Sequence, residues 1–361
     1  MAAPFLIVIL CAEQALMSSN LFFDAPVPSV EELERSAIAY RLKNIRKGYV
    51  KMHVINEKPY PRNMELLYEI TFDEKRVRQI VRKRIPGNAE WGNPEKIIVT
   101  QDKCITDFED GAVPTAVQIV KAKEYKTPRE HFRMLNVQAL GMDINGADGL
   151  HESDVESLMN RSDRTIPVVH ADVRKGVETW RIDYVRKNKQ EETGLHVSLW
   201  IAPRQGYSVV GIEVRSDQDG KRYTFVIDSE MMQYPVGEIW YPSKVVKTVK
   251  TDNEVVDRQI MTIEEARFGD QIDEAAFTPA GLNLKPGKEV VDYSSAQAHL
   301  NVWNGKELVK PSQVNVPPRN PALHRRPRWL LLALAAGLGL LSVVYFWRVF
   351  RKRRSASRSG A

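Results

Sequence analysis

The residues of this chain that could do chemistry are not spaced as a catalytic or metal site requires. Seven histidines stand at positions 53, 131, 151, 170, 196, 299 and 324, and no two have the spacing of metal ligands on one helix. The stretch GYSVVG at residues 206–211 lies inside a strand pattern, not in the sharp turn that exposes a nucleophilic serine. The sequence also lacks a Gly-rich loop with a lysine to cradle a phosphate. We therefore expect no metal site, no cofactor and no enzyme activity.

The stretch DINGADGLHESD at residues 143–154 resembles a calcium-binding loop in composition. Asp143, Asn145 and Asp148 offer the hard oxygens that calcium prefers. The register differs from a calcium loop, because Asp148 stands where the turn glycine belongs and Asp154 replaces the bidentate glutamate. A solvated loop that caps a following short helix is the simpler interpretation, and calcium binding stays an alternative.

The two ends of the chain have the composition of export and membrane segments. The uncharged stretch WLLLALAAGLGLLSVVYFW at residues 329–347 is long enough to cross a bilayer, and basic residues mark a cytoplasmic tail at 348–361. Residues 1–19 carry an apolar run of signal-peptide length, which no Lys or Arg precedes. Removal of that peptide would take Cys11 away and leave Cys104 without a disulfide partner. These ends predict a single-pass inner-membrane protein whose main domain lies in the periplasm.

The charge of the chain divides unevenly along its length. Nine of the 52 Lys and Arg residues follow Leu323, so residues 1–323 carry 43 basic and 46 acidic side chains. The formal net charge of +6 is therefore a property of the C-terminal end. It indicates contact with anionic lipid headgroups and not with nucleic acid.

The first half of the predicted core domain, residues 28–292, combines one helix with several strands. Ser29 is an N-cap candidate with Glu32 three residues on, and residues 31–48 have the spacing of an amphipathic helix. In MELLYEITF, residues 64–72, every second residue is apolar and falls on one face of a strand. The predicted strands are residues 49–55, 64–72, 75–85, 96–101 and 103–108.

The second half repeats this alternation more strongly. Residues 207–214 and 223–229 pair across Asp219-Gly220, where glycine provides the positive φ of a tight hairpin turn. Residues 236–250 and 253–268 form a further long pair. Because hairpins follow one another without regular β/α alternation, we predict a large antiparallel sheet with few helices. Residues 293–328, rich in Pro, Asn and Lys, are predicted to be an extended linker.

Several of these stretches resemble one known family. The opening helix leading into GYVKMHV, together with LWIAPRQGYSVVGIEV, GEIWYPSKVV and FTPAGLNLKPGKEVVD, is similar to the periplasmic lipoprotein-carrier superfamily. That superfamily includes outer-membrane lipoprotein-sorting proteins, and residues 200–292 match it best. The resemblance implies an α+β, mainly antiparallel β fold, a curved incomplete (half-open) β-barrel with lid helices. To this fold the sequence adds one C-terminal transmembrane helix.

The resemblance also implies an apolar cavity that holds acyl chains. The predicted function is a membrane-anchored binding module for lipid or lipoprotein acyl chains, in lipoprotein sorting, with the membrane and an envelope protein as partners. Two alternatives stay open: an envelope-stress regulator of the same fold, and an anchored hydrolase with an unrecognised site. Apolar strand residues also fill ordinary cores, so the wall residues are candidates only. They are Leu66, Tyr68, Trp180, Leu199 and Trp240.

Overall fold

The structure is a computed structural model, and residues 1–310 and 311–361 form two separate units. Of the second unit, only the short 3-10 helix η7 (Pro311–Gln313) is described. The described residues are 26–58, 64–108, 116–122, 135, 137–142, 165–186, 194–218, 220–269, 272–295 and 297–313.

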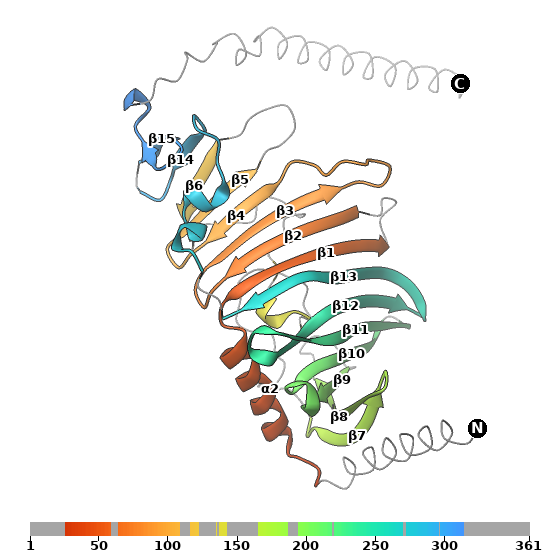
Figure 1. Ribbon diagram of the computed structural model, residues 1–361. Helices are drawn as coiled ribbons and strands as arrows, with labels where there is room; N and C mark the ends of the chain where they lie inside the picture. The colour runs from red at the N-terminus through yellow and green to blue at the C-terminus, as the bar shows by residue number, and fades with distance from the viewer. Residues whose placement is uncertain are drawn as a thin grey trace, which may run out of the picture. The chain divides into compact units, whose positions relative to one another are not determined.

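Sixteen strands of the described chain form one continuous sheet, with β7 and β16 at its edges (Figure 1). The order is β16-β15-β14-β6-β5-β4-β3-β2-β1-β13-β12-β11-β10-β9-β8-β7. Neighbouring strands are antiparallel, except that β14 runs parallel to β6. The bounds are β1 (Gly48–Lys58), β2 (Met64–Phe72), β3 (Val77–Arg84), β4 (Glu95–Val99), β5 (Lys103–Phe108), β6 (Val117–Lys121), β7 (Val168–Arg174), β8 (Val177–Arg186), β9 (Leu195–Ala202), β10 (Ser208–Gln218), β11 (Lys221–Tyr234), β12 (Ile239–Thr251), β13 (Glu254–Phe268), β14 (Glu289–Asp292), β15 (His299–Trp303) and β16 (Leu308–Val309).

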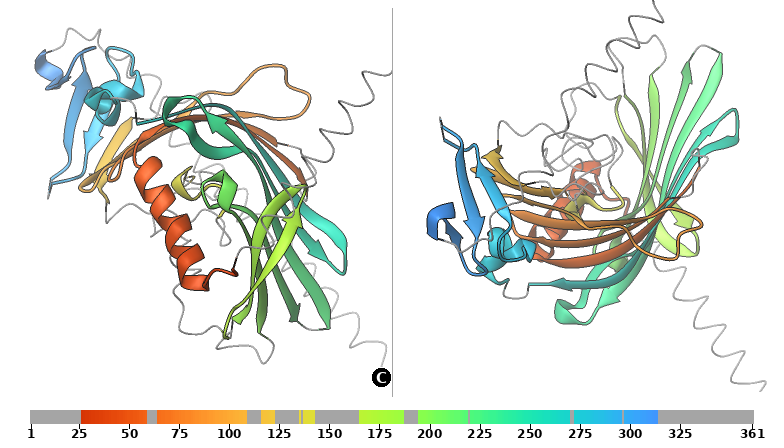
Figure 2. Two further views of the ribbon diagram at one scale, coloured as in Figure 1. Left: turned by 60° about the horizontal axis from the view of Figure 1, so that its bottom comes forward. Right: turned by 90° about the horizontal axis from the view of Figure 1, so that it is seen from above.

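The sheet is strongly curved, and register shifts in its middle strands account for the curvature (Figure 2). The shifts lie in the pairings of β1 with β13, β10 with β9, β11 with β12, and β12 with β13. Each shift places an extra residue in one strand, as Val210 in β10, and such bulges bend a strand and increase its twist. The curvature creates an inner face, on which the single described α-helix lies.

That helix, α2 (Val30–Asn44), begins as the sequence predicts. Ser29 is its N-cap, and the Ser29 side chain accepts a hydrogen bond of 3.1 Å from the Glu32 N–H. The residues it buries recur at helical spacing, so one side of the helix faces the sheet. They are Val30, Leu33, Glu34, Ala37 and Arg41.

The chain after β13 packs apolar side chains on the opposite face of β4 to β6 and then extends the sheet at the β6 edge. After β13 the chain forms the 3-10 helices η5 (Glu274–Phe277) and η6 (Pro279–Leu282) and then β14 to β16. These elements pack their apolar side chains in one cluster with three strands of the main sheet. The cluster contains Ile98, Ile105, Val117, Ile119, Phe277, Leu282, Leu284, Val290 and Trp303.

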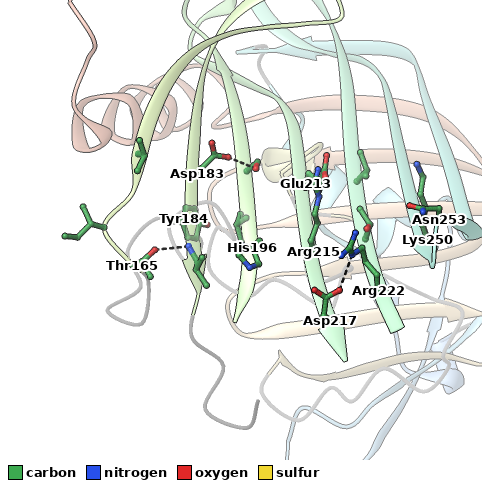
Figure 3. Close-up of a pocket in the computed structure, with 17 residues that line it drawn as sticks. Thr165, Asp183, Tyr184, His196, Glu213, Arg215, Asp217, Arg222, Lys250 and Asn253 are labelled. Atoms are coloured by element: carbon green, nitrogen blue, oxygen red, sulfur yellow. Dashed lines mark hydrogen bonds and ion pairs between the residues drawn. The ribbon is translucent and has the colours of Figure 1, made fainter. Parts of the chain in front are cut away.

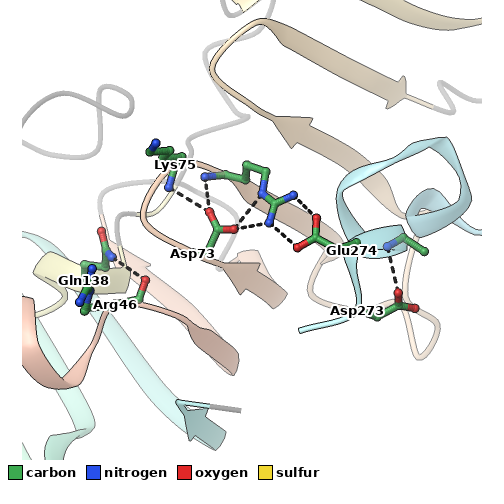
Figure 4. A network of polar contacts seen from close by, with 8 residues as sticks. Arg46, Asp73, Lys75, Gln138, Asp273 and Glu274 are labelled. Atoms are coloured by element: carbon green, nitrogen blue, oxygen red, sulfur yellow. Dashed lines mark hydrogen bonds and ion pairs between the residues drawn. The ribbon is translucent and has the colours of Figure 1, made fainter. Parts of the chain in front are cut away.

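Arg76, in the β2–β3 turn, joins η5 to the main sheet through Asp73 and Glu274, which Figure 4 labels. Its Nε donates to Asp73 Oδ2 at 2.8 Å, its Nη2 donates to Glu274 Oε1 at 2.9 Å, and its guanidinium lies 4.3 Å from the centroid of the Phe277 ring. The Arg76 bond lowers the pKa of Glu274 below its ordinary value of 4.5. The Arg76 side chain thus holds the β2–β3 turn and the start of η5 together.

A second network of polar and cation–π contacts lies on the outer face of the sheet near β7. Arg174 Nη2 donates to Asp228 Oδ1 at 2.6 Å, and its guanidinium lies 3.7 Å from the centroid of the Trp200 ring. Trp200 Nε1 donates to Asp172 Oδ2 at 2.9 Å. Arg174 crosses directly over Gly211, where a Cβ would overlap its Nε. The absence of a side chain at Gly211 therefore lets β7 connect across the sheet to β11.

The predicted fold class, a half-open barrel with lid helices and a C-terminal transmembrane helix, is wrong for the described residues. They contain one α-helix, and their strands form one open sheet whose edges do not pair. Residues 289–309 extend this sheet by three strands at the β6 edge, and the last two of these strands fall in the range predicted as a linker. Short strands in polar sequence gave no alternation strong enough to be recognised.

The described residues do not support the predicted single-pass inner-membrane location. Among the described residues, no helix has the length and hydropathy needed to cross a bilayer. Four predicted segments lie outside the described residues. They are the signal peptide at 1–19, the calcium-like loop at 143–154, the apolar stretch at 329–347 and the tail at 348–361.

We predict that Gly211→Ala destabilises the protein by about 1–3 kcal/mol, because the new methyl group displaces Arg174 from Trp200 and Asp228. Urea unfolding measures this loss. In an Arg174→Ala background the same glycine substitution should lower the free energy of unfolding by less than ~0.5 kcal/mol, because the side chain that the new methyl group would meet is absent. Equal losses in both backgrounds would show that Arg174 is not the cause.

We also predict that the Arg76–Glu274 pair makes the protein acid-sensitive. Because the Glu274 pKa is lowered in the folded protein, its stabilisation is present above pH 4.5 and is lost as the pH falls through the folded value. Urea midpoints at pH 7 and pH 3 should therefore differ less in Glu274→Gln than in the wild type. Glu254→Gln, at an exposed position of β13, is the control and should behave as the wild type does.

Candidate binding site on the inner face of the sheet

The inner face carries a continuous apolar surface across the width of the sheet. Ile182, Leu199, Ile212 and Ile227 lie opposite one another on successive strands and form one row, each at most 1% exposed. The same cluster reaches from β8 across β13 and β1 to β5. An eleven-strand width of about 50 Å follows from the ~4.8 Å spacing of strands. The inner face thus carries the largest cluster of buried apolar side chains among the described residues.

Two segments cover one end of this face. Tyr40 of α2 accepts a hydrogen bond of 2.6 Å from the Trp240 N–H at the start of β12. Residues 137–142, which include the 3-10 helix η2 (Val137–Ala139), lie beside α2, where Gln138 Nε2 donates to Ile45 O at 3.1 Å. Val137 O accepts a hydrogen bond of 2.8 Å from Tyr241 Oη. Since α2 is only about 22 Å long, it spans less than half of the width of the face.

Aromatic side chains pack beneath these segments. The ring centroids of Tyr241 and Phe268 are 4.8 Å apart, and Tyr234 lies at 6.1 Å from Phe268. Burial raises the pKa of Tyr234 to about 12 and raises that of Tyr241 further. Both hydroxyls are therefore neutral at physiological pH, and the charged residues that α2 buries at this end of the face are Glu34 and Arg41.

Towards the other end of the strands the same face becomes less buried. The row formed by Tyr184, Val197, Val214 and Phe225 continues the alternation by one step, and its last two members are only partly buried. Val249 lies opposite Phe225 and is half-buried too. Apolar side chains at this end are therefore within reach of a ligand.

Four of the five residues predicted from the sequence belong to the inner face. Leu66, Tyr68, Trp180 and Leu199 are buried there in the main cluster. Trp240 does not join them, because its neighbours Ile239 and Tyr241 occupy the inner face and a strand alternates its side chains. The structure therefore brings together four of the predicted residues and leaves Trp240 on the other face.

Two open clefts lie elsewhere. One, of about 930 Å³, is lined mainly by outer-face residues of β8 to β12, including Asp183, Glu213, Arg215 and Lys250 (Figure 3). The other, of about 590 Å³, lies among turns near Arg46 and Asp73. Neither is lined by any of the five predicted residues, and both carry charged groups of both signs. Of the inner-face rows, only Tyr184 and Val197 line the first cleft, and none of their residues lines the second.

The chemistry available in the described residues is limited. They contain no group of three or more His, Cys, Asp or Glu that could hold a metal ion. Cys104 is fully buried in the main cluster, and burial raises the pKa of its thiol to about 12. The thiol is thus protonated at neutral pH and is a poor nucleophile.

We predict that the Cys104 thiol of the folded protein does not react with Ellman's reagent at pH 8. A Cys11→Ser variant leaves Cys104 as the single thiol of the chain. Reaction should begin only at urea concentrations that unfold the protein, because both the high pKa and the burial protect the sulfur. Rapid stoichiometric reaction without urea would contradict the burial of Cys104.

Comparison with known proteins places this chain in no family. No family model matches it, and no curated protein matches it. Among solved structures, a distant structural neighbour is the crystal structure of LprF from Mycobacterium bovis, with 12% sequence identity over 69% of this chain and 97% of that chain and a TM-score of 0.27. A likeness this low carries no argument about function, so the resemblance to lipoprotein carriers stays a prediction from the sequence.

Proposed function

We propose that this protein is a binding module for acyl chains of lipids or lipoproteins, which it holds on the inner face of the sheet without chemistry. The observation that supports the proposal is how far the apolar inner face extends along the strands. Its apolar rows run from beneath α2 to the opposite ends of the strands, where Val214 and Phe225 are only partly buried. A flexible apolar chain is the ligand class that such a surface fits.

The length of an ordinary acyl chain is enough for a useful affinity. Burial of one methylene contributes ~0.8 kcal/mol, so about 16 methylenes contribute ~13 kcal/mol. Association costs at least ~4 kcal/mol, which leaves an affinity near the micromolar range. Polar residues flank the apolar rows on neighbouring strands. One example is Gln259, whose Nε2 donates to Asn56 Oδ1 at 2.7 Å. Their amides are uncharged, so the acyl chain itself would be held by hydrophobic burial.

The experiment titrates the full chain with a fluorescent fatty acid and compares two variants of one strand. Phe225 faces the inner side of β11, whereas its neighbour Thr224 points to the outer face. We predict that Phe225→Arg weakens binding at least about tenfold, because an arginine on the ligand's path must lose its hydration.

Thr224→Arg is the matched control, since it adds the same charge one residue away on the opposite face. It should bind as the wild type does, and both variants should keep the wild-type urea midpoint within a small difference. A wild-type protein that does not bind the probe, or two variants with equal losses, would refute binding at the inner face.

A further inference from the structure

Arg41 is a buried cation for which the described residues provide no counter-ion. It projects from the inner side of α2 and is 7% exposed. Its guanidinium lies 5.6 Å from the centroid of the Tyr241 ring, and among the described residues it forms no ion pair with a carboxylate. Burial of an ion without a partner of opposite charge costs several kcal/mol, so this arrangement needs a reason.

The hydrogen bonds of Arg41 offset only part of the free-energy cost of burying its charge. Nη1 donates to Gln138 O at 3.3 Å and Nη2 donates to Leu140 O at 3.4 Å. Both distances exceed the usual range for N–H···O bonds, and both acceptors are neutral. Nε has no acceptor at all. Burial also lowers the Arg41 pKa, which agrees with an under-compensated charge.

A second buried donor without a partner lies against the same backbone segment, residues 138–141. Ser229 of β11 is 7% exposed, and its Oγ has no hydrogen-bond partner. The hydroxyl lies against Gly141, where an added Cβ would contact Ser229 Oγ. Leu140, the residue before Gly141, is the one whose carbonyl faces Arg41. The Arg41 N–H and the Ser229 O–H therefore flank one short segment under α2.

We propose that Arg41 receives the oxyanion of an amphiphilic ligand whose acyl chain lies on the inner face, so that the protein selects anionic over neutral lipids. This inference rests on the proposed function. A carboxylate or phosphate oxygen would take the place of the two carbonyls, because charge-assisted bonds are shorter and roughly twice as strong as neutral ones. Since folding has already removed water from the guanidinium, the ligand does not bear that part of the cost. Ser229 Oγ would donate to the same group.

The test measures binding of three ligands with the same sixteen-carbon chain to the full protein, below their critical micelle concentrations. The ligands are palmitate, hexadecyl phosphate and methyl palmitate, and inorganic phosphate alone is a fourth arm. We expect the wild type to bind at least one of the two anions about tenfold or more tightly than the ester. The stronger of the two identifies the source of the oxyanion, and inorganic phosphate should neither bind nor compete at millimolar concentration.

Arg41→Gln should lose this preference while it keeps the affinity for methyl palmitate, and Arg41→Lys should retain part of it. Leu42→Gln, at a 63% exposed position of the same helix, is the control and should keep the full preference. Equal binding of anions and ester by the wild type would overturn the inference and leave acyl binding intact, even where Arg41→Gln fails to fold. Competition by inorganic phosphate would also overturn it, and failure of all three amphiphiles would refute the proposed function as well.

Discussion

The pairing of β1 with β13 holds the two halves of the described chain together. Strands β1 to β6 and β7 to β13 are each built from neighbours in sequence, which hairpin turns bring side by side. The β1–β13 ladder, from Gly48 opposite Phe268 to Lys58 opposite Arg258, joins strands that lie far apart in the sequence. Its loop-closure cost is recovered only once both halves exist, so the inner face is complete only in the full sheet.

Curvature and burial of the inner face follow from this joined sheet. The register shifts concentrate in and around the β1–β13 junction, where they bend the strands around α2. The 3-10 helices η5 and η6 pack on the opposite side of β4 to β6, and Arg76 holds η5 there. The sheet therefore has apolar side chains on its inner face and polar networks on its outer face. We infer that this asymmetry supports the binding of an apolar chain on one face only.

The sequence predicts local structure well where a single periodicity dominates. In MELLYEITF the alternation is strict, and Leu66, Tyr68, Ile70 and Phe72 are buried as expected. The run Ile239 to Pro242 is apolar at four consecutive positions, so alternation could not assign Trp240 to a face. Arg41 was missed as a site residue because a cation on an amphipathic helix is usually exposed. Non-local pairing, such as β1 with β13, leaves no local signal to read.

The most direct measurement is a crystal structure of the full chain with a brominated fatty acid, in which anomalous scattering locates the acyl chain. We expect bromine peaks on the inner face, beside the partly buried side chains of Val214 and Phe225. Peaks confined to the charged cleft near Arg215 and Lys250, or crystals soaked to saturation without any bound chain, would contradict the account.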